Sequence, residues 1–169
     1  MTITEGLKEL KLIEKKLKKN CTLLEKYSSQ PSNEKPYFTS EQEQKKEIDA
    51  ILQSSEDLVK NYLEIHRKIN VTNLKTMVEI NGHTYSIHSL IQIRRKLASL
   101  IVGVYQSLND NNYYKSASQF KNSQNIDLTV TRFYEEKQKQ SKIRHWEDFY
   151  NSIDGRLETI NATTQLIEE

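Results

Sequence analysis

Residues that bend or cross-link a chain are scarce in this sequence, whose 169 residues include only 4 Gly, 2 Pro and 1 Cys. The single cysteine, Cys21, excludes an internal disulfide and, by itself, a cysteine zinc cluster. With little turn-forming material, a mean hydropathy of -0.77 and 28% charged residues, the chain is expected to form long helices with polar outer faces. The length fits one domain, residues 1–169.

Long apolar runs and an excess of one charge are also missing. No apolar run approaches the ~18 residues needed to span a bilayer, and residues 1–6 lack the basic and apolar regions of a signal peptide. Lys+Arg (25) and Asp+Glu (23) nearly cancel to a formal charge of +2, which argues against a global attraction to nucleic acid or membrane. We therefore expect a cytoplasmic protein with no membrane partner, in which nucleic-acid binding by a local patch is possible but not favoured.

Two helical patterns fill the first half of the chain. The first helix is predicted over about 4–27, where Thr2 and Glu5 have the spacing of a capping box. The second is predicted over about 41–69, with a hydroxyl residue at Ser40 able to cap it, and residues 28–40 contain both prolines and form the connection. Apolar residues recur every three or four positions in each helix. The first seam is Leu10, Ile13, Leu17, Asn20, Leu24 and Tyr27, and the second is Ile48, Ile51, Ser55, Leu58, Tyr62, Ile65 and Ile69.

Residues 74–86 are the only stretch with an alternating pattern, and they predict a β-hairpin. Asn81-Gly82 at the centre suits a type I′ turn, in which both central residues have positive φ. This turn places Ile80 opposite His83 and Val78 opposite Tyr85, so one side of the ribbon is largely apolar. A two-stranded ribbon is marginally stable alone. It must therefore pack on the helices, gain a third strand or meet a partner chain.

The second half of the chain predicts two more helices, over about 87–109 and 127–166. The third helix has one break in its seam, at Arg94, and the connection 113–125 is polar and patternless, either a strand beside the hairpin or a mobile segment. In the last helix the apolar stripe lapses over residues 135–140, which suggests that this part projects or pairs with another chain. The third seam is Ile87, Leu90, Arg94, Leu97, Ile101, Val104 and Leu108, and the fourth is Val130, Phe133, Ile143, Trp146, Tyr150, Ile153, Leu157 and Ile160.

Together these patterns predict a mainly α fold, a four-helix up-down bundle with long coiled-coil-like helices and a small β-hairpin between helices 2 and 3. The order of several motifs resembles the septicolysin-like family of uncharacterised bacterial and phage proteins. These motifs are residues 69–73, the Asn-Gly hairpin, residues 91–97, the 114–127 linker and residues 161–166. The resemblance implies a helical bundle with a small β element, and it implies no established activity.

Polar residues are expected to meet at one pole of such a bundle, because the second and fourth helices end where the third begins. The predicted cluster is Asn70, Thr72, Asn73, Arg94, Arg95, Asn161, Thr163 and Thr164. It is either a self-satisfied cap of the pole or a small polar ligand site. Arg94 would then pair structurally or contact an anion or carbonyl.

A second candidate surface consists of lysines on the first helix. Lys15, Lys16, Lys18 and Lys19 form either a solvated face or an anion-binding face. Glu14 stands four residues before Lys18, in the favourable order for an ion pair.

Motifs for catalysis are missing, so no enzyme, cofactor or metal is predicted. The favoured hypothesis is a non-catalytic helical interaction protein that forms a homo-oligomer through the hairpin 74–86 or the helix 127–166. One alternative is a nucleic-acid or anion-binding module that uses the helix 1 lysines with Arg94 and Arg95. Another is a small-molecule sensor at the polar pole.

Overall fold

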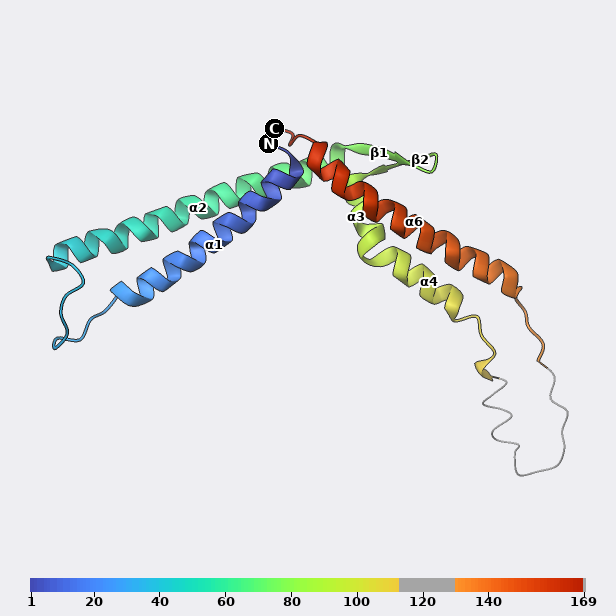
Figure 1. Ribbon diagram of the computed structural model, residues 1–169, viewed down its shortest axis with the longest axis horizontal. Coiled ribbons are helices and arrows are strands. Elements are labelled where there is room, and N and C mark those ends of the chain that lie inside the picture. The colour runs from blue at the N-terminus through green and yellow to red at the C-terminus, as the bar shows by residue number, and fades with distance from the viewer. Residues whose placement is uncertain (113–129, 169) are drawn as a thin grey trace, which may run out of the picture. The chain divides into compact units, whose positions relative to one another are not determined.

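A computed structural model describes residues 1–112 and 130–168 of the chain (Figure 1). The described part is mainly α-helical, with a two-stranded antiparallel hairpin between the second and third helical segments, as predicted. Where one domain was expected, the contacts divide the chain into two compact units. The first unit comprises Met1–Thr76 and Thr159–Glu169, and the second comprises Met77–Glu158.

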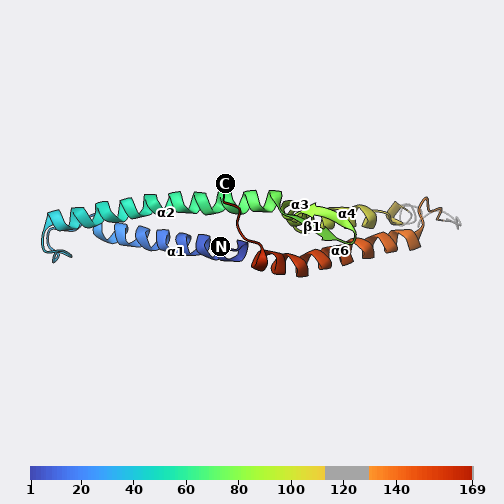
Figure 2. The ribbon, with the colours of Figure 1, turned by 90° about the horizontal axis from the view of Figure 1, so that it is seen from above.

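The first unit is built on an antiparallel pair of long helices, α1 (Ile3–Tyr27) and α2 (Glu41–Lys75), which lie side by side (Figure 2). The capping box that begins α1 is confirmed: Thr2 Oγ1 accepts from the Glu5 amide at 3.2 Å, and Glu5 Oε2 accepts from the Thr2 amide at 2.8 Å. The predicted cap of α2 is also present, since Ser40 Oγ accepts from the Glu43 amide. Both helix starts follow from local capping chemistry.

The seam between α1 and α2 contains two polar residues that face each other. Asn20 donates a hydrogen bond to Ser55 Oγ at 3.0 Å, and Ser55 donates in turn to the carbonyl of Ile51 at 2.7 Å. The two polar side chains that interrupt the apolar pattern are therefore hydrogen-bonded to each other. Nearby on α1, Cys21 is a free, exposed thiol.

The second helix is longer than predicted, because it continues from Ile69 through Lys75. Residues 70–73 are helical, and the hairpin begins at Met77 rather than at residue 74. Thr72 explains the extension: it is fully buried one turn beyond Ile69 and keeps the three-four spacing of the seam. A polar sequence was thus wrongly interpreted as the end of the helix.

The end of the chain folds back onto the first unit as an extended segment. The last helix, α6 (Glu136–Thr163), stops three residues before the predicted end at 166. The Ile3 amide donates to the Thr164 carbonyl at 3.0 Å, and the Leu166 amide donates to the Met1 carbonyl at 2.8 Å. These pairings with residues at the start of the chain take the place of further helical turns.

In the second unit, β1 (Met77–Ile80) and β2 (His83–Ser86) form the predicted hairpin. Asn81 and Gly82 have φ values of 52° and 78°, and the predicted register, Ile80 opposite His83 and Val78 opposite Tyr85, is confirmed. The apolar side is covered within the unit: Ile80 is buried, and the ring of Tyr85 lies 5.8 Å from that of Phe149 on α6.

The third helical segment is interrupted by one π-helical turn. It consists of α3 (Ile87–Gln92), the π-turn η1 (Ile93–Leu97) and α4 (Ala98–Gln106). A π-turn adds one residue to the helix, so every later side chain is rotated by about 100° relative to a continuous α-helix. Ala98 is buried in place of Leu97, and the predicted seam is wrong at Leu97, Val104 and Leu108, which are exposed.

The predicted start of the last helix at 127, with its Asp127 cap, lies outside the described residues, as does the connection 113–125. Within the described range, residues 130–135 are not helical and α6 begins at Glu136. Val130 and Phe133 therefore do not belong to a helical stripe. The buried residues of α6 are Ile143, Phe149, Ile153 and Leu157.

Candidate interaction site

Of the residues predicted for the polar cluster, Thr72 is buried in the first unit and is bound to backbone groups of residues outside the cluster. The Thr72 hydroxyl donates to the carbonyl of Lys68 at 2.7 Å and accepts from the amide of Ile167 at 2.9 Å. Because Thr72 is fully buried, both hydrogen bonds are shielded from water. They hold the extended end of the chain against α2.

The other polar residues predicted for this pole have separate roles within the first unit. Asn70 is exposed and contacts the ring of His66, whereas Thr163 bonds to the backbone of its own helix. Thr164 contributes its backbone carbonyl. The side-chain carbonyl oxygens of Asn73 and Asn161 are shielded from solvent, and neither has a hydrogen-bond partner among the described residues.

Arg94 and Arg95 belong to the second unit. Arg94 forms an ion pair with Asp154 of α6, and both side chains are about half exposed, at 46% and 48%. The geometry therefore favours a structural ion pair for Arg94 over a contact with an anion or carbonyl of a ligand. Arg95 is exposed on the π-turn.

The four predicted anion contacts, Lys15, Lys16, Lys18 and Lys19, are all exposed on α1. The carboxylate expected to pair with Lys18, that of Glu14, instead accepts a hydrogen bond from the hydroxyl of Tyr62 at 3.3 Å. The lysine face is thus accessible, and anion binding by it stays a prediction.

The most unusual surface in the described part of the chain runs from the last residue of η1 along the outer face of α4 to the turn that follows it. Leu97, Leu100, Val104 and Leu108 recur at helical spacing, and they are 49%, 54%, 62% and 38% exposed. No residue from 97 to 108 is charged, although more than a quarter of the whole chain is. A helix that is apolar on both its inner and outer faces is normally covered on both. We call these four residues the α4 stripe.

An apolar groove of about 400 Å³ lies between α4 and α6. Its walls come from α4 and α6, and they are lined by Ala98, Ser99, Val102, Trp146, Glu147, Tyr150 and Asn151. Trp146 is oriented by edge contacts with Phe149 and His145, at ring distances of 5.9 and 6.0 Å. The only tryptophan of the chain therefore stands in a defined position in the wall of the groove.

Residues 130–135 are fastened beyond the end of α4 by the carboxylate of Asp110. Arg132 Nε donates to both carboxylate oxygens, at 3.0 and 3.1 Å, and the Tyr134 hydroxyl donates to one of them at 3.4 Å. The hydrogen bond from Arg132 holds the pKa of Asp110 below its usual value, and its bond to Asp110 raises the pKa of Arg132. We call this arrangement the Asp110 clamp.

No group of three or more His, Cys, Asp or Glu side chains is arranged to hold a metal ion in residues 1–112 and 130–168. None of the helices in these ranges is both long and apolar enough to cross a bilayer. Comparison of the chain with family models, curated proteins and solved structures finds no match.

Three residues of the α4 stripe, Leu97, Val104 and Leu108, were predicted to lie in the packed seam of the third helix, and the fourth, Leu100, was not predicted. It also placed Phe133, Trp146 and Tyr150 in one helical seam. The signal that could have corrected the first assignment is the second apolar pattern of the same helix, Ala98, Val102 and Tyr105, one position later. Which of two adjacent patterns faces inward depends on the π-turn, which has no sequence signature of its own.

Proposed function

We propose that this protein is a non-catalytic helical interaction protein that self-associates through the second unit. The observation that supports this most strongly is the α4 stripe, an exposed apolar row on a helix without charged residues. Contiguous exposed apolar patches on proteins in water commonly mark interaction sites. A second copy offers the same uncharged row, so two stripes can meet without burying a charge.

The stripe is a better candidate for the interface than the two surfaces expected from the sequence. The apolar side of the hairpin is covered by Phe149, and the apolar stripe of α6 is buried. The start of α6 is also engaged locally, because Lys139 lies over the ring of Tyr134 and pairs with Glu136 at 3.3 Å. These segments have less apolar surface left for a partner than α4 has.

The resemblance to the septicolysin-like family stays a prediction and adds no activity.

The test is the mass of the protein in solution with charges introduced into the stripe. We expect the unmodified protein to form dimers whose fraction rises with concentration, measured by light scattering. The double substitution Leu100→Glu with Val104→Glu should weaken association at least about a hundredfold, or about 2.7 kcal/mol, because four carboxylates would be buried without partners.

A matched control is Leu63→Glu, which alters a side chain of similar exposure, 62%, on α2 of the first unit. It should leave the dimer intact. Circular dichroism verifies that each variant keeps its helices, which is expected since the changed side chains are exposed. A protein that is monomeric at every accessible concentration would rule out self-association.

A further inference from the structure

The outward face of α1 carries a row of lysines with no other residue type among them. Leu10 and Ile13 are buried, so they mark the side of α1 that packs. Between residues 8 and 19, every position that helical geometry places within an arc of about 100° on the opposite side is a lysine. The predicted contact Lys16 lies outside this arc, about 60° beyond its edge. We call the five exposed lysines within it the α1 lysine row: Lys8, Lys11, Lys15, Lys18 and Lys19.

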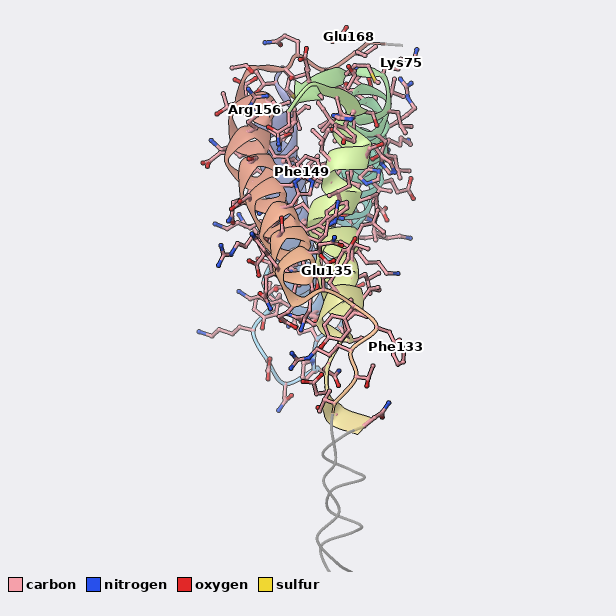
Figure 3. The ribbon with its side chains drawn as sticks, turned by 90° about the vertical axis from the view of Figure 1, so that its right-hand side faces the viewer. Lys75, Phe133, Glu135, Phe149, Arg156 and Glu168 are labelled. Atoms are coloured by element: carbon pink, nitrogen blue, oxygen red, sulfur yellow. The ribbon has the colours of Figure 1, made fainter. Side chains whose placement is uncertain are left out.

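The side-chain charges of the α1 lysine row are not compensated within the described part of the chain. None of the five ammonium groups has an ion pair or a hydrogen bond with another described residue. Several basic side chains elsewhere are engaged. Lys68 pairs with Glu64 at 3.1 Å, and Arg156 on α6 donates to the carbonyl of Glu79 (Figure 3). Glu14, the carboxylate closest to the row in sequence, is bonded to a tyrosine of α2 instead.

The spacing of the row makes its charges repel one another. Lys11, Lys15 and Lys19 follow at intervals of four residues, and like charges at this spacing destabilise a helix. With seven lysines against four glutamates, α1 carries a formal charge of +3, more than the +2 of the whole chain. A negatively charged partner would relieve this repulsion.

We propose that the α1 lysine row binds the phosphate backbone of a nucleic-acid duplex without reading its sequence. From Lys8 to Lys19 the row rises about 16 Å along the helix, and a duplex presents one negative charge for each ~1.7 Å of its axis. Five ammonium groups on one helix can therefore meet successive phosphates. The binding does not depend on self-association, because α1 belongs to the first unit and α4 to the second.

The composition of α1 favours phosphate contacts over recognition of bases. Base edges are read mainly by Arg, Asn and Gln, which form paired hydrogen bonds in the grooves. The helix has no arginine or glutamine, and its only asparagine, Asn20, is bonded to Ser55. Single strands are held largely by aromatic side chains that stack on bases, whereas the only aromatic residue of α1 is its last, Tyr27. A duplex bound through its phosphates therefore fits α1 better than a single strand.

A membrane surface fits the same helix less well. Helices that lie in a membrane interface bury an apolar face in the lipid. The apolar face of α1, with Leu10 and Ile13, packs against α2 instead. Its exposed leucines, Leu7 and Leu12, lie on opposite sides of the lysine row, so they form no common apolar face.

The test is binding of the full chain to a short fluorescent DNA duplex, followed by anisotropy between about 50 and about 200 mM salt. With five phosphate contacts, the logarithm of the binding constant should fall with the logarithm of the salt concentration at a slope of about −4.5. Two duplexes of unrelated sequence should bind within about threefold of each other, because phosphates carry no sequence information.

A triple variant removes the centre of the row, and a matched variant changes the same charge elsewhere. Lys11→Gln with Lys15→Gln and Lys18→Gln should reduce the slope to about −2 and the affinity at about 50 mM salt at least tenfold. Glutamine forms helices about as well as lysine, so circular dichroism should be unchanged. The control is a triple substitution of exposed lysines on α2, which should change neither slope nor affinity: Lys45→Gln, Lys46→Gln and Lys60→Gln.

Competing polyanions test the class of partner. We expect the duplex to bind more tightly than single-stranded DNA, vesicles containing phosphatidylserine or polyglutamate, compared at equal concentrations of charge. If any of these three binds more tightly than the duplex, the partner assigned here is wrong. If no duplex binding occurs at about 50 mM salt, or if the α2 variant lowers it as much as the α1 variant does, the row does not bind nucleic acid. Light scattering without DNA measures self-association independently of all these outcomes.

Discussion

The two units handle interruptions of their apolar patterns in different ways. In the first unit, polar side chains within the packing are satisfied by neutral partners, as Asn20 is by Ser55 and Thr72 is by the backbone. In the second, charged side chains pair near the surface, as Arg94 does with Asp154 and Arg132 does with Asp110. The first unit thus pairs Asn20 and Thr72 with neutral groups and leaves the shielded carbonyl oxygens of Asn73 and Asn161 without partners among the described residues, while the second turns an uncharged helical face outward.

Exposed apolar residues in the first unit do not contradict this comparison. Leu52, Val59 and Leu63 on α2 are exposed, but charged residues such as Glu56, Lys60 and Glu64 stand between and beside them. Apolar side chains scattered among charges are ordinary features of protein surfaces. The α4 stripe differs because twelve successive residues carry no charge.

The largest expected effects come from truncating one buried side chain in the core of each unit. Ile13 and Ile153 are both fully buried, one in each unit. Ile13→Ala and Ile153→Ala should each cost about 2–5 kcal/mol through lost burial and a residual cavity. Hydrogen exchange should then show weakened protection in α1 and α2 for the first and in the β-hairpin and α3 for the second. Equal loss of protection in both units after either change would show that they unfold together.

A smaller effect is expected from removing the buried hydroxyl of the first unit. Thr72→Val preserves the shape of the side chain but leaves the Ile167 amide without its acceptor, which should cost about 1–3 kcal/mol. Urea unfolding measures the loss, and exchange of the Ile167 amide should accelerate. Thr72→Ser keeps the hydroxyl and is the control. If serine and valine variants exchange this amide equally fast, the hydrogen bond does not hold the segment.

The smallest effect concerns the Asp110 clamp of the second unit. Because the hydrogen bond from Arg132 lowers the pKa of Asp110 in the folded protein, its pairing is fully present above the ordinary pKa of an unfolded aspartate and is lost as the pH falls through the lowered folded pKa. Backbone amide signals of residues 131–134 in NMR spectra should therefore change in this acidic range.

Asp110→Asn serves as the control for this titration. The variant should lack the transition and show the released spectrum already at neutral pH. The Thr72 hydrogen bonds involve no titratable group and should persist through the same range. A transition of residues 131–134 that survives in Asp110→Asn would assign it to another group.

Features with local causes could be predicted from the sequence. The caps at Thr2 and Ser40 need only residues three positions away, and the hairpin register needs only Asn81-Gly82 and the alternation around it. The features that were missed depend on distant partners. Residues 164–168 are extended because they pair with the start of the chain and with Thr72, and residues 130–135 are held by Asp110, twenty-two positions before Arg132.

The candidate interface was less predictable than the fold for a related reason. Two apolar patterns one residue apart run along α4, and the sequence does not show which is buried. Because of the π-turn at residues 93–97, Ala98 is buried and Leu97 is exposed. An exposed ring at position 133 could not be anticipated while that position was assigned to a helix, because the clamp that excludes the helix joins residues across the chain.

The exposed thiol of Cys21 allows the unfolding of the two units to be followed separately. It lies on α1 of the first unit, whereas the only indole, that of Trp146, lies on α6 in the second. A thiol-reactive dye will therefore label a single site without any substitution, and an absorbing dye far from the tryptophan spectrum leaves the indole emission readable. Dye and indole signals recorded from the same sample during denaturation would report the melting of each unit separately.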